Sequence, residues 1–200
     1  MLLLATILLI GVLLGFGLGG DIRNLATAEL RLWWVLPVAV ALQVAPIPRA
    51  EGQVGANLPF AALIRSFALI GLVCGVNWRL RGFPTLLLGV LLNLIPISLN
   101  QGMPVSAEAV IEVGGSVEDL PTQRGAKHHL ATRDDVLTIL GDTIAVREPF
   151  KAVVSIGDIV MWVGAALFVT AAMLARERRT DVPPTHPHRA RSATKSGTPR

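Results

Sequence analysis

The chain has 200 residues, of which 52% are hydrophobic and only 16% are charged, and its mean hydropathy is +0.58. A soluble domain carries about 25% charged residues, so these values exclude an ordinary soluble domain and a disordered chain and favour a multi-span membrane protein. The formal net charge of +4 comes from the tail, because residues 176–200 carry a net +5 and the rest of the chain a net −1. This distribution does not favour nucleic acid as a partner. The single cysteine, Cys74, excludes an intramolecular disulfide.

Five apolar runs predict five membrane-spanning helices, each of which needs about 20 residues. For the first run a cleaved signal peptide is the alternative, and the lack of a basic start and of an Ala-x-Ala site argues against it. The second run is interrupted by Pro37. We therefore predict an all-α integral membrane protein, with residues 1–175 as the membrane domain. The predicted spans cover residues 1–19, 28–45, 58–77, 83–99 and 156–175.

The basic residues of the short loops predict the orientation, because Lys and Arg are enriched on the cytoplasmic side. With the N-terminus outside and the C-terminus in the cytoplasm, Arg23, Arg31, Arg79 and Arg81 fall on the cytoplasmic side, together with the tail. The long segment 100–155 is then an extracytoplasmic loop, and its net charge of −3 fits that side. The predicted location is the plasma membrane.

Two parts of this loop are predicted to be ordered. They are residues 105–113 and the amphipathic stretch 134–146, which we expect to form a surface-lying or re-entrant helix. The tail, residues 176–200, has almost no bulky apolar side chains, so we expect it to be disordered. Its positive charge would attract anionic lipid of the inner leaflet, and simple retention on the cytoplasmic side is the alternative.

Glycines at four-residue spacing predict closely packed helices. Gly11, Gly15 and Gly19 follow this spacing in the first run, and Gly71 and Gly75 follow it in the third. Small residues four positions apart allow two helix backbones to approach closely in a membrane. The spacing does not say whether the partner helix belongs to the same chain.

Polar residues inside the spans predict a cluster in the outer half of the membrane. Such residues are costly in hydrocarbon and rarely face lipid. Gln43, Arg65, Asn93 and Asp158 all fall in the outer half of their spans in the predicted orientation. We expect Arg65 to pair with Asp158 or to donate a hydrogen bond to Asn93. The cluster is either a small polar binding site or a structural pair that holds the helices together.

The loop carries two adjacent histidines, His128 and His129, upstream of several aspartates. Histidine and carboxylate groups can bind zinc or copper. Adjacent side chains point to opposite sides of an extended or helical backbone, so this pair offers one ligand. We therefore predict no metal and no cofactor. The chain carries no catalytic motif, which favours a protein that is not an enzyme.

Four short motifs occur in order along the outer side of the predicted bundle. They are Asn100-Gln-Gly-Met-Pro-Val105, Lys127-His128, Leu140-Gly-Asp142 and Ser155-Ile-Gly-Asp158. Over residues 1–175 this order resembles the DUF5317 family, a family of multi-pass bacterial membrane proteins, found largely in Gram-positive lineages, without an assigned activity. The chain departs from the family pattern at Gln101, where glycine is expected, and at His129. The resemblance implies that one site combines Arg65, Asn93, Asn100, His128, Asp142 and Asp158.

The leading functional hypothesis is a non-enzymatic binding or accessory component of the membrane. Its extracytoplasmic polar site would engage a small polar ligand, a lipid head group or a partner protein, including a second copy of the chain. A small transporter or proton-relay protein that acts as an oligomer through Arg65, Asn93 and Asp158 is the alternative. An envelope enzyme that modifies lipid through His128 and Asp142 is a more remote one.

Overall fold

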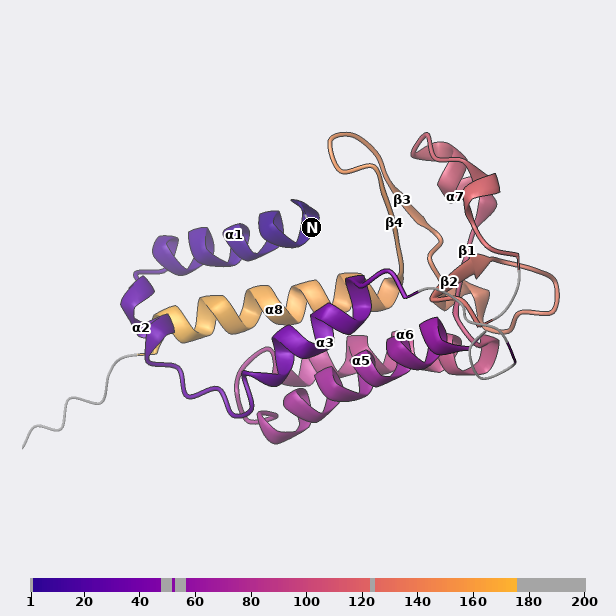
Figure 1. Cartoon of the computed structure of the whole chain (residues 1–200). Helices are drawn as coiled ribbons and strands as arrows, with labels where there is room; N and C mark the ends of the chain where they lie inside the picture. Colours follow the sequence, from indigo (N-terminus) through magenta and orange to yellow (C-terminus); the bar gives the residue numbers. More distant parts are fainter. Residues whose placement is uncertain (1, 48–51, 53–56, 123–124, 176–200) are drawn as a thin grey trace, which may run out of the picture.

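The computed structural model describes residues 2–47, 52, 57–122 and 125–175, and it is mostly helical (Figure 1). Its apolar helices are α1 (Leu2–Gly17), α3 (Val35–Val44), α5 (Leu58–Val76), α6 (Phe83–Asn100) and α8 (Ile156–Leu174). Helices α5, α6 and α8 are long and apolar enough to span a membrane, which indicates a membrane protein. Helices α1 and α3 are shorter apolar helices at the positions expected for the first two spans. The count of five spans stays a prediction, and the tail lies outside the described residues.

Smaller elements fill the connections. The segment between α6 and α8, residues 101–155, is called the loop module below, and in Figure 1 it lies at one end of the helices. Helix α2 (Ile22–Ala26) follows α1. The loop module contains β1 (Met103–Val105), α7 (Ala107–Glu112), η1 (Val117–Asp119), β2 (His128–Leu130), η2 (Thr138–Leu140), β3 (Ile144–Val146) and β4 (Ala152–Val154).

The five apolar helices run alternately in opposite directions between two ends of the molecule. At the end with the loop module, the Lys127 ammonium contacts the last carbonyls of α3, and the Phe60 N–H at the start of α5 donates to the Gly125 carbonyl. At the opposite end, the Met173 carbonyl near the end of α8 accepts from the Asp21 N–H that follows α1. These contacts fix which helix ends lie together.

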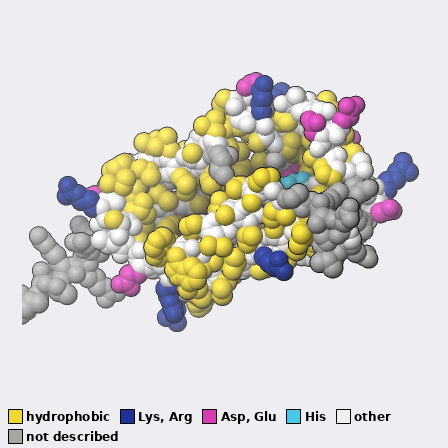
Figure 2. Space-filling view, in the orientation of Figure 1, with side chains coloured by type: hydrophobic (Ala, Val, Ile, Leu, Met, Phe, Trp, Pro, Cys, Tyr) yellow, Lys and Arg dark blue, Asp and Glu magenta, His cyan; other side chains and the backbone are white. Residues whose placement is uncertain are grey.

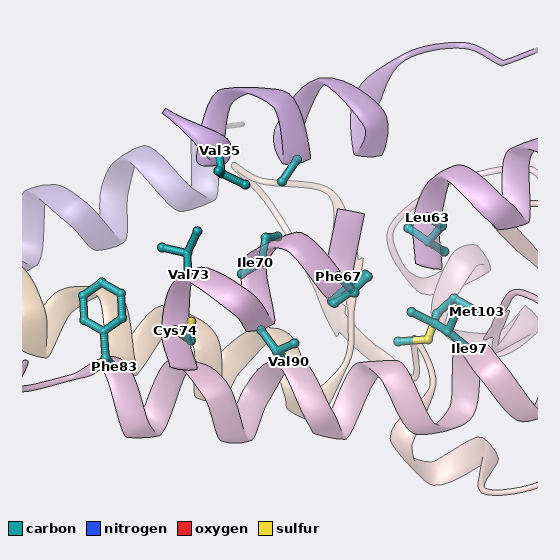
Figure 3. Packing of buried hydrophobic residues seen from close by; sticks show 11 residues of the cluster. Val35, Leu63, Phe67, Ile70, Val73, Cys74, Phe83, Val90, Ile97 and Met103 are labelled. Carbon is teal, nitrogen blue, oxygen red and sulfur yellow. The ribbon is translucent and has the colours of Figure 1, made fainter. Parts of the chain in front are cut away.

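The hydrophobic core lies where α3, α5 and α6 pack against one another (Figure 3). A buried hydroxyl crosses the α3–α5 contact, because Ser66 donates to the Ala39 carbonyl at 2.8 Å. Met103 of β1 belongs to the same cluster, so the loop module is joined to the core of the helices. The buried members are Val35, Ala39, Leu63, Phe67, Ile70, Val73, Cys74, Phe83, Val90, Ile97 and Met103.

Glycines bring α6 and α8 into close contact. A Cβ atom at Gly89 would lie 2.5 Å from Cγ of Met161 and 2.6 Å from the carbonyl oxygen of Gly157. A Cβ atom at Gly157 would collide with the Asn93 side chain. A larger residue at either glycine would therefore push the helices apart. The close approach places the start of α8 directly beside Asn93.

The predicted glycine packing is confirmed in α1 for two of its three positions. A Cβ atom at Gly11 or at Gly15 would lie 3.0 Å or less from an atom of α8, whereas Gly19 has nothing within 4 Å. In α5, a Cβ at Gly75 would meet nothing within 4 Å, and one at Gly71 would make only an ordinary contact at 3.6 Å. Among the described residues, the α5 glycines therefore mark no close helix contact.

The stretch 134–146 does not form the amphipathic helix that its apolar pattern predicts. The N–H and carbonyl of Val136 both bond to the Asn100 side chain, so they cannot join a helical ladder. Leu137 follows with a left-handed φ of +54°. Only the single turn η2 forms before Gly141, where the backbone packs against Pro104. The other stretch expected to be ordered, 105–113, contains α7.

Candidate functional site

Strand β1 brings two distant parts of the loop module together. Strand β2 pairs with it in parallel, with His128 opposite Met103. On the other edge of β1, an isolated bridge pairs Asp142 with Val105. Paired residues point to the same face of a sheet, and so do residues two apart along a strand. His128 and Asp142 therefore project from the same face.

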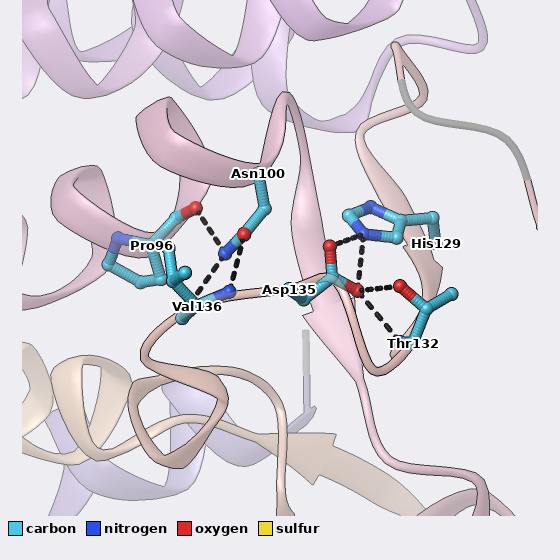
Figure 4. Close-up of polar contacts among 6 residues, drawn as sticks. All are labelled: Pro96, Asn100, His129, Thr132, Asp135 and Val136. Carbon is cyan, nitrogen blue, oxygen red and sulfur yellow. Dashed lines mark hydrogen bonds and ion pairs between the residues drawn. The ribbon is translucent and has the colours of Figure 1, made fainter.

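His129, the next residue of β2, faces the other way. Its Nε2 lies 3.3 Å from both carboxylate oxygens of Asp135, and the two side chains are almost fully buried (Figure 4). Asp135 also accepts from the backbone N–H and the hydroxyl of Thr132. The adjacent histidines thus point to opposite sides, as expected from the sequence. Only His128 faces the residues considered next.

The first turn of α8 holds Asp158 in place. The Ser155 hydroxyl accepts from the Asp158 N–H at 3.0 Å, and the Asp158 carboxylate accepts from the Ser155 N–H at 3.2 Å, which is a capping box. Across the contact with α6, the Asn93 amide donates to Oδ1 of Asp158 at 2.7 Å. The Asn93 oxygen accepts from the Ser155 hydroxyl at 2.7 Å. Both oxygens of Asp158 are therefore already hydrogen-bonded.

Asp142, in contrast, has a buried carboxylate that accepts no hydrogen bond from any described residue. Its side chain is 10% exposed, and Nε2 of His128 lies 3.6 Å from its Oδ2, beyond hydrogen-bond distance. Its main chain is anchored, because its N–H donates to the Pro104 carbonyl and its carbonyl accepts from the Ser106 N–H. Burial, together with the nearby charge of Asp158, raises the pKa of Asp142 well above its usual value.

His128 lines a hollow between the loop module and the end of α3. On the face shown in Figure 2, a histidine side chain reaches the surface. Partial burial lowers the pKa of His128 below its usual value, against the opposing charge of Asp158, and 49% of the side chain stays exposed. His128 also lines a cavity of about 570 Å³ beside the end of α3, with Gln43 and Lys127. His128 therefore borders the cavity and also lies beside Asp142. We call His128, Asp142 and Asp158 the acid–imidazole cluster.

Lys127 has a structural role beside this cluster. Its ammonium donates to the carbonyls of Leu42, Gln43 and Ala45 at 2.9, 2.9 and 2.6 Å. The last carbonyls of a helix have no partner within the helix, so Lys127 caps the C-terminal end of α3. Its charge is consequently engaged with backbone and does not neutralise Asp142.

Asn100 also has a structural role, in a separate contact. At the end of α6, its amide donates to the carbonyls of Pro96 and Val136 at 2.9 Å each, and its oxygen accepts from the Val136 N–H at 2.9 Å (Figure 4). Asn100 is 1% exposed. It therefore fastens the loop module to α6 and has no described contact with the acid–imidazole cluster.

Arg65 does not join the other predicted site residues. Its side chain is exposed on α5, and it makes no ion pair or hydrogen bond with another described residue. The expected contact with Asp158 or Asn93 is not formed. Asp158 belongs to α8, whereas α5 packs against α3 and α6. Asn93 is on α6, but it is buried while Arg65 is exposed. Asn93 supplies the donor to Asp158 instead.

The structure thus brings Asn93, His128, Asp142 and Asp158 together and leaves Arg65 and Asn100 outside the cluster. Ser155, which completes the network, was not among the predicted site residues. Its signal in the sequence is the spacing Ser-x-x-Asp before an apolar run, which is typical of a helix N-cap. Among the described residues, no three or more His, Cys, Asp or Glu side chains are placed to hold a metal ion.

Comparison with known proteins gives a family. The chain matches the model of a family of unknown function, DUF5317, over residues 27–170. No curated protein and no solved structure matches the chain. The matched range covers well over half of the sequence and includes α3, α5, α6, the loop module and most of α8. The chain therefore belongs to the DUF5317 family.

Proposed function

We propose that the protein is a non-enzymatic binding component of the cell membrane, and that its acid–imidazole cluster takes up a small polar ligand that donates hydrogen bonds, such as an amine. The observation that carries this proposal is the Asp142 carboxylate, which is nine-tenths buried and accepts no hydrogen bond from the described residues. A buried polar group without a partner is costly. A ligand that supplies the donor would remove this cost.

The charges of the cluster favour a cationic ligand over an anionic one. Asp142 and Asp158 are both acidic, and the ammonium of Lys127, the cation next to the cluster in the sequence, already caps α3. Desolvation lowers the pKa of His128, which favours its neutral form. An amine would add a positive charge and several N–H donors in one small group. The cavity beside His128 supplies an approach to the site.

The alternating helix directions support the proposed orientation. The loop module and the ends of α3 and α6 lie together. The turn that carries Arg79 and the short helix α2, which carries Arg23, lie at the other end. We propose that the loop-module end is extracytoplasmic, with the N-terminus outside, and that the basic tail is cytoplasmic, where it meets anionic lipid. The ligand would then reach the cluster from outside the cell.

A proton relay or carrier through the same residues receives less support from the geometry. Such a protein needs a path from the cluster to the opposite membrane face. The contact of Gly89 with Gly157 and Met161 is too close to leave room for water between α6 and α8 at that level. Arg65, which the carrier hypothesis also needs, forms no ion pair with Asp158. A carrier would therefore have to work as an oligomer, with the path between two copies of the chain.

The proposal is tested by ligand stabilisation of the purified chain in lipid nanodiscs. Ethanolamine serves as the amine probe, and sodium acetate at equal ionic strength serves as the anionic comparison. A ligand that binds only the folded protein raises the unfolding midpoint, by about 2–4 °C for each kcal/mol in a chain of this size. We expect ethanolamine to raise the midpoint of the wild-type protein and acetate to leave it unchanged.

Two variants decide where the probe binds. Asp142→Asn removes the negative charge and should abolish the rise, whereas Glu118→Gln removes an exposed carboxylate of the loop module and should leave it intact. Because the proton competes with the amine for Asp142, the rise should also grow with pH above the usual carboxyl range. A wild-type protein that ethanolamine does not stabilise, or an equal rise in Asp142→Asn, would contradict the proposal.

A further inference from the structure

A second site lies at the end of the molecule opposite the loop module. We propose that the turn between α5 and α6 binds an anionic phospholipid, with Arg79 and Arg81 holding the phosphate and an apolar wall between α6 and α8 holding part of an acyl chain. This proposal is independent of the acid–imidazole cluster and of the ligand proposed for it.

The position of the turn places it at a membrane surface. Helix α5 ends at Val76 and α6 begins at Phe83, and both helices are long and apolar enough to span a membrane. A short turn between two spanning helices emerges where the lipid head groups lie, whichever face of the membrane it occupies. Helix α8, the third such helix, ends beside it at Leu174. The location therefore does not depend on the predicted orientation.

Three cavities surround this turn. Their volumes are about 720, 490 and 560 Å³, within the range of small-molecule sites. Arg79 lines all three, Arg81 lines the first two, and Arg31 lines the third. The basic side chains thus border concave surfaces instead of extending from a convex one. A phosphate in any of these hollows would lie beside Arg79 and one further arginine.

The charges of these arginines are available for a ligand. Arg79 and Arg81 are exposed, and neither makes an ion pair or a side-chain hydrogen bond with another described residue. Glu29 is the one carboxylate among the described residues that line the three cavities, and it forms no ion pair with Arg31 or Arg79. Arginine binds phosphate through paired N–H donors. The excess positive charge favours an anionic head group over a zwitterionic one.

The apolar side of the site favours a lipid over a free phosphate ion. The 490 Å³ cavity is lined by Trp78, Pro84, Leu167 and Leu174 in addition to the two arginines. Trp78 is 60% exposed, and tryptophan is enriched at the level of lipid head groups. An acyl chain can therefore lie against the apolar residues while its phosphate contacts the arginines. A free phosphate ion would leave that wall uncovered.

The backbone around the site is fixed before a ligand arrives. Asn77, which is 4% exposed, accepts from the Arg31 N–H at 2.9 Å and donates to the Arg31 carbonyl at 2.8 Å. It also donates to the Val73 carbonyl at 2.8 Å. The segment before α3 is thereby fastened to the end of α5, and Arg31 is held close to the turn that carries Arg79.

The experiment is native mass spectrometry of the detergent-solubilised full chain, titrated separately with phosphatidylglycerol, phosphatidylcholine and inorganic phosphate. We expect phosphatidylglycerol to be retained in preference to phosphatidylcholine. Arg79→Gln/Arg81→Gln should weaken its binding about 10- to 30-fold, which corresponds to roughly 1 kcal/mol for each basic residue near the lipid phosphate. The binding should also weaken as ionic strength rises.

A matched variant, Arg133→Gln/Lys151→Gln, removes the same charge from the exposed surface of the loop module and should keep the wild-type preference. Circular dichroism of both variants reports whether the helices persist. An equal loss in both variants would assign the effect to net charge alone, and no preference in the wild-type protein would overturn the site. Inorganic phosphate that displaces phosphatidylglycerol at similar concentration would show an anion site without a lipid component, which also contradicts the proposal.

Discussion

Replacing Gly157 by alanine tests the close contact on which the acid–imidazole cluster rests. The added Cβ atom would collide with the Asn93 oxygen and would lie 2.9 Å from the carbonyl oxygen of Gly89. Either Asn93 moves away, or α6 and α8 separate. In both cases Asn93 loses its bonds to Asp158 and Ser155. The start of α8 would then lose its tie to α6.

The size of the effect follows from these bonds. Each polar group left buried without a partner costs about 1–3 kcal/mol, and two bonds are lost. Alanine in place of glycine within a helix raises the free energy of unfolding by about 1 kcal/mol. We therefore expect Gly157→Ala to lower the free energy of unfolding by about 3 kcal/mol. Gly75→Ala is the matched control, because a Cβ there meets nothing within 4 Å and only the gain in helix propensity remains.

Unfolding in mixed micelles with increasing dodecyl sulfate, followed by far-ultraviolet circular dichroism, measures both variants. A second test removes the larger obstacle: in an Asn93→Ala background, Gly157→Ala should cost clearly less than it does in the wild-type protein, since the colliding oxygen is gone and only the 2.9 Å approach to the Gly89 carbonyl remains. If Gly157→Ala is as stable as Gly75→Ala, or if the two effects simply add, the reasoning about this contact is refuted.

Three further predictions concern the loop module and its connections. Because burial raises the pKa of Asp142, the folded chain binds the carboxyl proton of Asp142 more tightly than the unfolded chain does. This contribution to stability is lost as pH rises from the usual carboxyl pKa of 3.8 through the raised pKa. Asp142→Asn should flatten this decline in unfolding curves measured across pH. Lys127→Met removes three bonds to the end of α3 and should cost about 2 kcal/mol in the same assay. Gln101 has a left-handed φ of +54°, so Gln101→Gly should stabilise the protein by about 1 kcal/mol, and a loss of stability would contradict the strain.

Much of the helical architecture is predictable because apolar runs and glycine spacing are local signals. The positions of α1, α3, α5, α6 and α8 follow from such runs. The prediction for the stretch 134–146 is wrong because its apolar residues suit a helix, whereas hydrogen bonds to Asn100, which is distant in the sequence, hold its backbone in another conformation. Hydrogen bonds between distant residues leave no periodic pattern in a single sequence.

The candidate site was predictable in part for the same reason. The presence of Asn93 and Asp158 in one polar cluster follows from the cost of polar groups inside a membrane, because such groups rarely face lipid. The prediction of Arg65 as the partner of these residues is wrong, since the actual pairing depends on which helices are neighbours. The approach of His128 to Asp142 depends on strand register in β1, which three-residue strands do not reveal.

The connections of the loop module carry a mechanical consequence. Two residues, Gln101 and Gly102, separate α6 from β1, and one residue, Ser155, separates β4 from α8. Such short links leave no slack, and Asn100 adds a fastening at the end of α6. A rotation or tilt of α6 must therefore displace β1, with which His128 of β2 and the bridge residue Asp142 are aligned. A movement of α8 must likewise displace β4 and its partner β3. A ligand bound at His128 and Asp142 as proposed would therefore respond to a shift of α6, and its binding could report on the position of that helix.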